Sequence, residues 1–272
     1  MPAFQSWPIT PAAPVKTFLW PAPHQKAAVL LAHGFGEYSA RYHRLIGAMN
    51  GAGYSVYTYD QRGHGESTGR RAVADLRHLV QDHIAARSAL RSLDVPLFAF
   101  GHSMGGLITA ASYLQDPRGV KGVVLSSPAL LVGVNEPRWR KQAGRVLARL
   151  VPHLPLAELP TEGLSRLPEE VEAYRNDPLM YHGNVPVLTG ISMLRLSESL
   201  WSTAGSWKLP TLTVHGDQDK IADVNGSRRF MEVIGSTDKT YHEVAGGFHE
   251  LFNDTERDDL TRELLAWMDA RA

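Results

Sequence analysis

A serine near the middle of the chain lies in the pattern Gly-x-Ser-x-Gly, which residues 101–105 (GHSMG) form. The apolar residues 96–101 are typical of a strand, and residues 104–115 have a helical pattern rich in small side chains. A tight turn between such a strand and helix exposes the serine hydroxyl, and the helix N-terminus behind it favours negative charge. The pattern predicts Ser103 as a nucleophile. An ordinary serine in a glycine-rich turn is the alternative.

A serine hydroxyl is a weak nucleophile and needs an adjacent base. Among the 12 histidines, His249 lies in a loop between the last predicted strand and the last predicted helix. His33, His215 and His242 lie in or at the ends of predicted strands, and the side chain of His102 should turn away from its neighbour Ser103. We therefore predict His249 as the base. A surface loop histidine without a catalytic role is the alternative.

Two carboxylates follow the predicted strand 211–215, and either could orient the imidazole of His249. They are Asp217 and Asp219, in the run His-Gly-Asp-Gln-Asp. We predict Asp219 as the acid and a loop-forming role for Asp217. No histidine pair at metal-ligand spacing accompanies them, so we expect no metal.

Ester hydrolysis also requires two fixed donors for the oxygen that becomes negatively charged. The backbone N–H of Met104, directly after the nucleophile, is one candidate. The turn at residues 33–36 (HGFG), after an apolar strand-like run, offers the second, for which we predict the N–H of Phe35. A turn without a catalytic role is the alternative.

The elements that position these residues alternate between strand and helix up to residue 127 and again from residue 207. An edge strand is expected near residues 16–20. Alternation of this kind predicts an α/β fold with a mostly parallel sheet flanked by helices. Residues 128–206 contain helical patterns interrupted by prolines, and we expect helices without strands there. We interpret this segment as a helical cap inserted into a core formed by residues 1–127 and 207–272.

The composition excludes several classes of protein. Lys and Arg total 28 and Asp and Glu total 28, so the formal net charge is zero and nucleic acid is not an expected partner. There is no cysteine, which excludes disulfides and cysteine nucleophiles. We find no signal-peptide pattern and no apolar stretch long enough to span a membrane, and therefore expect a cytoplasmic location.

Taken together, these residues resemble the α/β-hydrolase superfamily and, within it, the monoacylglycerol lipases, which are also grouped as lysophospholipase-like serine hydrolases. The resemblance runs from about residue 25 to the C-terminus. Its motifs are residues 33–42 (HGFGEYSARY), 60–67 (DQRGHGES), 101–106 (GHSMGG), 174–179 (YRNDPL), 215–219 (HGDQD) and 247–250 (GFHE).

The resemblance implies an α/β-hydrolase fold and hydrolysis of a monoacylglycerol to fatty acid and glycerol, with no cofactor. It supports Ser103, Asp219 and His249 as a triad and Phe35 and Met104 as oxyanion donors. It also implies that Glu170 and Tyr174 of the cap lie near the glycerol end of the substrate. A broad carboxylesterase, a lysophospholipase and a non-catalytic ligand-binding member of the fold are the alternatives.

Two polar patterns remain. Glu37 and Arg41 are four residues apart, and we expect them to pair on the first turn of a helix. Binding of a polar headgroup is the alternative. Residues 137–151 (PRWRKQAGRVLARLV) predict an amphipathic helix with a basic face. We expect its apolar face to pack on its own domain. The alternative is a peripheral membrane contact through the cap, because basic amphipathic helices also bind anionic membranes.

Overall fold

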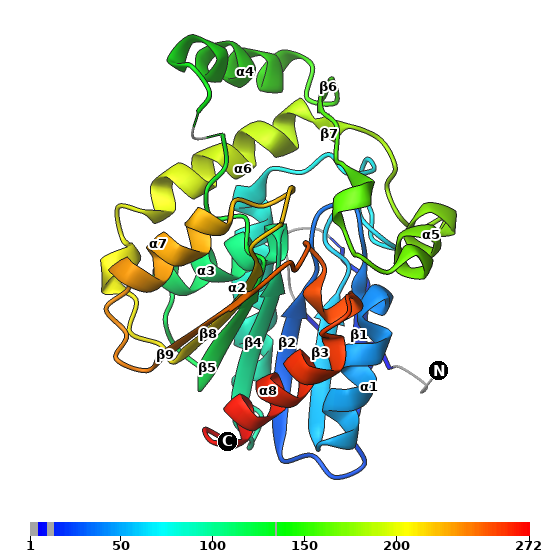
Figure 1. Ribbon diagram of the computed structural model, residues 1–272, viewed down its shortest axis with the longest axis vertical. Helices are drawn as coiled ribbons and strands as arrows, with labels where there is room; N and C mark the ends of the chain where they lie inside the picture. The colour runs from blue at the N-terminus through cyan, green and yellow to red at the C-terminus, as the bar shows by residue number, and fades with distance from the viewer. Residues whose placement is uncertain (1–4, 10–13, 134) are drawn as a thin grey trace.

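The computed structural model describes residues 5–9, 14–133 and 135–272, and a mostly parallel sheet crosses the molecule (Figure 1). Seven strands form it in the order β1-β3-β2-β4-β5-β8-β9, and only β1 is antiparallel to its neighbour. The strands are β1 (Thr17–Trp20), β2 (Ala27–Ala32), β3 (Tyr54–Tyr59), β4 (Leu97–His102), β5 (Gly122–Ser126), β8 (Thr211–Gly216) and β9 (Lys239–Val244). The predicted α/β fold and its edge strand are confirmed.

The central strands are buried on both faces, as continuous apolar runs predict. Every residue of β2, β4 and β5 is buried. Leu31 of β2 pairs with Phe100 of β4, which pairs with Val124 of β5, so the three strands end at nearly the same level. The loops that follow these strands therefore lie next to one another at the carboxyl edge of the sheet, where ligands of open α/β sheets bind.

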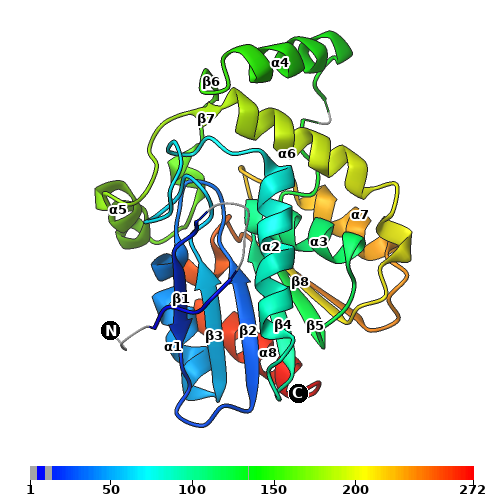
Figure 2. The same cartoon turned by 180° about the vertical axis from the view of Figure 1, so that it is seen from behind.

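Helices cover both faces of the sheet (Figures 1 and 2). Met49 of α1 and Trp267 of α8 pack into the core on one face. Leu79 of α2, Ile108 of α3 and Phe230 of α7 pack on the other. The bounds are α1 (His43–Gly51), α2 (Leu76–Leu90), α3 (Met104–Gln115), α7 (Val224–Val233) and α8 (Arg257–Asp269), with short 3-10 helices at Ser39–Tyr42, Thr161–Gly163, Ala204–Ser206 and Leu251–Asn253.

Between β5 and β8 the chain leaves the sheet and passes beyond its carboxyl edge (Figure 1). We call residues 127–210 the β5–β8 segment. It contains α4 (Arg138–Leu150), β6 (Pro155–Ala157), α5 (Pro168–Asn176), β7 (Val185–Pro186) and α6 (Val187–Leu200). The expectation of helices without strands was wrong, because β6 and β7 pair antiparallel. Both strands are very short and one begins and the other ends with proline, so they lack the alternating pattern that predicts a strand.

The helix α4 does not pack its apolar stripe on the rest of the protein, so the expectation for this helix was also wrong. It contacts α6 through its small residues: Ala148 packs with Ile191, and a Cβ atom on Gly144 would lie 2.3 Å from Ile191 Cδ1. These small residues allow the two helices to approach closely, and the apolar stripe then points elsewhere. Trp139 is 67% exposed and Leu150 is 73% exposed.

Across the described ranges, the helices are all too short or too polar to cross a membrane.

Candidate active site

Ser103 occupies a sharp turn between β4 and α3. Its backbone has φ 51° and ψ −118°, a conformation that is strained for a residue with a side chain. Glycines permit the surrounding contacts, since a Cβ atom on Gly105 would lie 2.4 Å from the carbonyl oxygen of His33, and one on Gly101 would lie 2.7 Å from that of Gly105. The turn is held in place by a hydrogen bond from the Ser103 N–H to the Ser126 carbonyl, 3.0 Å. The predicted strand–turn–helix context of Ser103 is confirmed.

The structure brings His249 and Asp219 together. His249 Nδ1 lies 2.7 Å from Asp219 Oδ2, and both side chains are almost completely buried. Asp217 lies apart from this pair, and its carboxylate accepts the N–H of Gly246 at 2.7 Å. The loop between β9 and α8 carries the imidazole, and the loop after β8 carries both aspartates. Asp219 thus contacts the predicted base and Asp217 supports a loop, and the catalytic role of Asp219 stays a prediction.

Asp219 is held by more than the imidazole of His249. Its Oδ1 accepts the N–H groups of Ile221 and Ala222 at 2.8 and 3.0 Å, and its Oδ2 lies 3.1 Å from His215 Nε2. His215 Nε2 also contacts the carbonyl of Ala222, which can only accept, so this nitrogen carries the proton. His215 Nδ1 then accepts from Ser227, 2.7 Å away. These donors fix the carboxylate independently of His249.

Electrostatics favour an ionised acid beside a basic imidazole. Burial alone would raise the pKa of Asp219, but the neighbouring His249 and His215 outweigh it and hold this pKa far below its ordinary value. Burial alone would lower the pKa of His249, but Asp219 outweighs it and raises this pKa. The imidazole is therefore a stronger proton acceptor than an ordinary buried histidine.

Ser103 and His249 line the same small cavity, of about 20 Å³. The loop of His249 is anchored there, because its N–H bonds the Gly163 carbonyl and its own carbonyl accepts the Ser127 hydroxyl at 2.7 Å. The ring of His102 lies 4.7 Å from that of His249, measured between centroids. In the described ranges Ser103 Oγ has no hydrogen-bond partner. Catalytic hydrogen bonds are often long without substrate and tighten when it binds.

The two predicted oxyanion donors both lie beside Ser103. Phe35 lines the small cavity, and Met104 begins the helix directly after the nucleophile. Among the residues that the structure describes, neither the N–H of Phe35 nor that of Met104 has a hydrogen-bond acceptor. The two amides are therefore available to an oxygen of a ligand.

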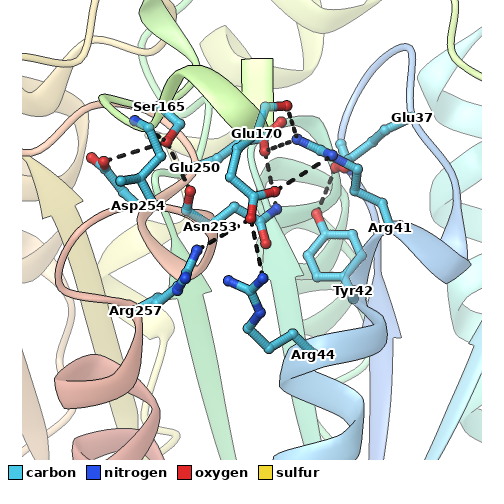
Figure 3. A network of polar contacts seen from close by, with 12 residues as sticks. Glu37, Arg41, Tyr42, Arg44, Ser165, Glu170, Glu250, Asn253, Asp254 and Arg257 are labelled. Carbon is cyan, nitrogen blue, oxygen red and sulfur yellow. Dashed lines mark hydrogen bonds and ion pairs between the residues drawn. The ribbon is translucent and has the colours of Figure 1, made fainter. Parts of the chain in front are cut away.

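A buried network braces the turn that carries Phe35 (Figure 3). Glu37 Oε1 accepts the N–H of Gly34 and the hydroxyl of Tyr42, each at 2.5 Å. Burial and, next, the nearby Glu250 raise the pKa of Glu37 to about 7. The expected pairing of Glu37 with Arg41 was wrong, because Arg41 Nη2 bonds Glu250 Oε2 instead, at 2.7 Å. Glu37, the last residue of the run 33–37 (HGFGE), was the sequence signal for this network. Its helical spacing to Arg41 suggested a different partner from Gly34 and Tyr42.

The two residues expected near glycerol lie in different surroundings. Tyr174 lines the small cavity with Ser103, and its hydroxyl donates to the Tyr181 carbonyl at 3.2 Å. Glu170 does not line that cavity. Its carboxylate instead contacts Arg44, Arg257 and Arg41 at 3.3, 3.2 and 3.9 Å (Figure 3). Contact of either residue with substrate stays a prediction.

A larger apolar cavity of about 730 Å³ also reaches Ser103. Its lining combines Phe35 of the core with apolar side chains of the β5–β8 segment, including Leu147 of α4, Leu156 of β6 and Leu194 of α6. Ligand sites of this size are usually lined in this way, by apolar side chains around a few polar groups. No cluster of three or more potential metal ligands occurs within the described ranges.

Comparisons with known proteins agree with this geometry. The family model described as "Serine aminopeptidase, S33" matches residues 23–256. The chain is 33% identical to a monoacylglycerol lipase of Mycolicibacterium smegmatis over 89% of this chain and 88% of that protein. It is 31% identical to Phospholipase YtpA of Bacillus subtilis over 92% and 98% of the two chains.

Among solved structures, the chain is similar to the monoacylglycerol lipase of Paleococcus ferrophilus, with a TM-score of 0.87, 32% identity and coverage of 95% of this chain and 100% of that one. The chain therefore belongs to the serine aminopeptidase S33 family of the α/β-hydrolase fold, and its relatives include monoacylglycerol lipases.

Proposed function

We propose that this protein is a serine hydrolase that cleaves monoacylglycerols to a fatty acid and glycerol. The observation that carries the proposal is the contact of His249 with Asp219 beside a strained Ser103 that lines an apolar cavity. The monoacylglycerol lipases among the relatives support this substrate class. The chemistry needs no cofactor, because a hydroxyl, a base and fixed amides suffice for acyl transfer.

In the proposed mechanism, Ser103 Oγ attacks the ester carbonyl while His249 Nε2 takes its proton. The carbonyl oxygen becomes negatively charged and is held by the N–H groups of Phe35 and Met104, each of which contributes about 3 kcal/mol. His249 then protonates the departing glycerol. Water repeats the sequence on the acyl-enzyme, and Asp219 stays ionised and orients the imidazole throughout.

The two cavities that Ser103 lines suggest where the two parts of the substrate would lie. The apolar cavity would accept one acyl chain. The small cavity has polar groups from Glu37, Tyr174 and Glu250, and at about 20 Å³ it would have to widen to accept the glycerol part. We retain Tyr174 as a contact for glycerol. For Glu170, whose carboxylate is bound by arginines, the proposed contact requires that substrate binding rearrange those ion pairs.

A second candidate function is that of a lysophospholipase. Its support is the similarity to a bacterial phospholipase over almost the full length of both chains. The two candidates differ in the group that leaves, since a lysophospholipid carries a charged phosphate where a monoacylglycerol carries a hydroxyl. A broad carboxylesterase would instead accept simple alkyl leaving groups.

We also propose that residues 128–206 form a cap that contacts a membrane peripherally. The exposed apolar residues of α4, among them Trp139 and Leu150, support this proposal. A helix with such a stripe and a basic face lies in the membrane interface with its apolar side inward. A cytoplasmic location for the protein stays a prediction.

A panel of esters with purified protein tests the proposed function. The panel combines several acyl-chain lengths with glycerol, glycerophosphocholine and simple alkyl leaving groups. We expect the highest kcat/KM for monoacylglycerols, and loss of all turnover in Ser103→Ala with an unchanged melting temperature. Turnover retained by this variant would overturn the assignment of the nucleophile. Failure of a fluorophosphonate to label Ser103 in the folded wild type would favour a non-catalytic binding protein.

A further inference from the structure

A groove, separate from the two cavities at Ser103, lies on the other side of α4 from the apolar cavity. It has a volume of about 680 Å³ and is formed by α4, α6 and the start of α2. Four arginines line it, with a single carboxylate: Arg77, Arg145, Arg149, Arg195 and Asp75. This concentration of positive charge contrasts with the zero net charge of the whole chain.

The positive charge of the groove is only partly neutralised. Asp75 is already bound by Arg77, with Nη2 2.6 Å from Oδ2. Arg149 and Arg195 are exposed, and in the described part of the chain neither has a hydrogen-bond or ion-pair partner. Arg145 reaches Glu198 only at 3.5 Å, and its buried Nε has no acceptor. The groove thus offers several guanidinium donors to a ligand with more than one acceptor oxygen, and phosphate is such a ligand.

Apolar groups beside the arginines indicate where the phosphate would come from. Val146 of α4 lines the same groove and is 54% exposed, and Leu150 follows one turn later. A soluble phosphate would gain nothing from these side chains. A phospholipid in a bilayer would contact both kinds of group, because its headgroup lies at the level of the arginines when the apolar stripe enters the acyl region.

We propose that this groove binds the phosphate of an anionic phospholipid at a bilayer surface. The inference rests on the proposed membrane contact of α4 and adds a defined headgroup site to it. Trp139 and Leu147 of the same helix line the apolar cavity and are exposed. A lipid held in the groove would therefore place this edge of the cavity against the bilayer from which an acyl chain enters.

Vesicle binding of charge-matched variants tests the headgroup site. Arg149→Gln/Arg195→Gln removes two charges from the groove, and Arg70→Gln/Lys121→Gln removes two exposed charges outside it. The full-length proteins are floated with phosphatidylcholine vesicles that contain or lack phosphatidylglycerol. We expect wild type and the control double variant to bind the anionic vesicles equally. The groove variant should bind them about 30-fold more weakly, since each basic side chain near an anionic surface adds about five-fold.

Three outcomes would overturn the proposal: equal binding of wild type to both kinds of vesicle, equal loss in the two double variants, or binding of inorganic phosphate by the wild type without binding of anionic vesicles. The last result would assign the groove to soluble phosphate.

Turnover of a short soluble ester and fluorophosphonate labelling are measured on the same proteins. Both double variants should retain wild-type values. If the wild type lacks these activities, the proposed hydrolase function fails while the vesicle result still reports on the groove.

Discussion

The carboxyl edge of the sheet and the β5–β8 segment differ in how completely they bury their side chains. At the edge, Gly105 fits directly against the carbonyl of His33, and the acid–base pair is buried. In the β5–β8 segment, α4 rests on α6 through Gly144 and Ala148 and leaves its large apolar side chains exposed. The comparison indicates that the buried edge fixes the positions of the groups proposed to react, whereas the segment leaves apolar side chains of α4 exposed at the border of the larger cavity.

The sharpest test at the edge compares the two aspartates. Asp219→Asn should lower kcat by about 10³–10⁴, because the wrong tautomer of His249 is then favoured. Asp217→Asn should change kcat only slightly, since its carboxylate supports a loop through the Gly246 N–H. Steady-state kinetics on a soluble ester measure both. An equal or reversed effect would show that the acid is misassigned.

A weaker effect is expected at the brace of the oxyanion turn. Glu37→Ala removes the acceptor for the Gly34 N–H and should lower kcat by up to about 10², with little change in KM, because the Phe35 amide is then misplaced. Glu37→Gln keeps an acceptor oxygen and should recover most of the loss. Asp82→Ala, at a buried carboxylate that pairs with Arg62, is the control for general destabilisation. If the glutamine variant is as slow as the alanine variant, the brace requires a charge rather than an acceptor.

The pH profile probes the same edge. His249 must be neutral to accept a proton, and its pKa is raised, so kcat/KM should fall as the pH decreases through a value above that of an ordinary histidine. The groups that face this imidazole are Asp219, His102, Glu250 and Glu37. Because the pKa of Glu37 is about 7, Glu37→Gln is profiled as well. An acid limb that persists in this variant belongs to His249, and one that disappears belongs to Glu37.

The smallest effect is expected in the β5–β8 segment. Gly144→Ala would bring a Cβ atom to 2.3 Å from Ile191 Cδ1 and should displace α4, changing the preference for acyl-chain length a few-fold with kcat on short esters unchanged. Gly47→Ala is the matched control, because a Cβ atom there meets open space within α1. A loss of short-ester turnover in Gly144→Ala alone would mean that the two regions are coupled.

The sequence predicted the sheet, its helices and the neighbourhood of the site well. Continuous apolar runs identify the strands β2 and β4, and helical spacing of apolar residues identifies α3. Because these elements are buried, their patterns fit few other kinds of secondary structure. Asp219 and His249 were predicted from the loops in which they lie, and the structure places them in contact. Loops after parallel strands converge at one edge, which is why such a contact can be anticipated.

Contacts between residues that lie far apart in the chain could not be predicted from the sequence. Arg41 bonds Glu250, 209 residues away, although a carboxylate four residues earlier offered the simpler pairing. The face by which α4 packs depends on Ile191 of another helix, so amphipathicity alone indicated the wrong side. The β6–β7 pair was missed because two proline-containing strands of this length carry almost no pattern.

The bonds that Asp219 makes without His249 have a consequence for stability. Ile221, Ala222 and His215 supply it with three donors, and Ser227 of α7 holds His215 in turn. Deleting the imidazole would therefore leave no orphaned carboxylate in the interior. A substitution of His249 could therefore abolish catalysis while the protein still folds. Such a change is a direct route from this fold to proteins that bind a lipid without hydrolysing it.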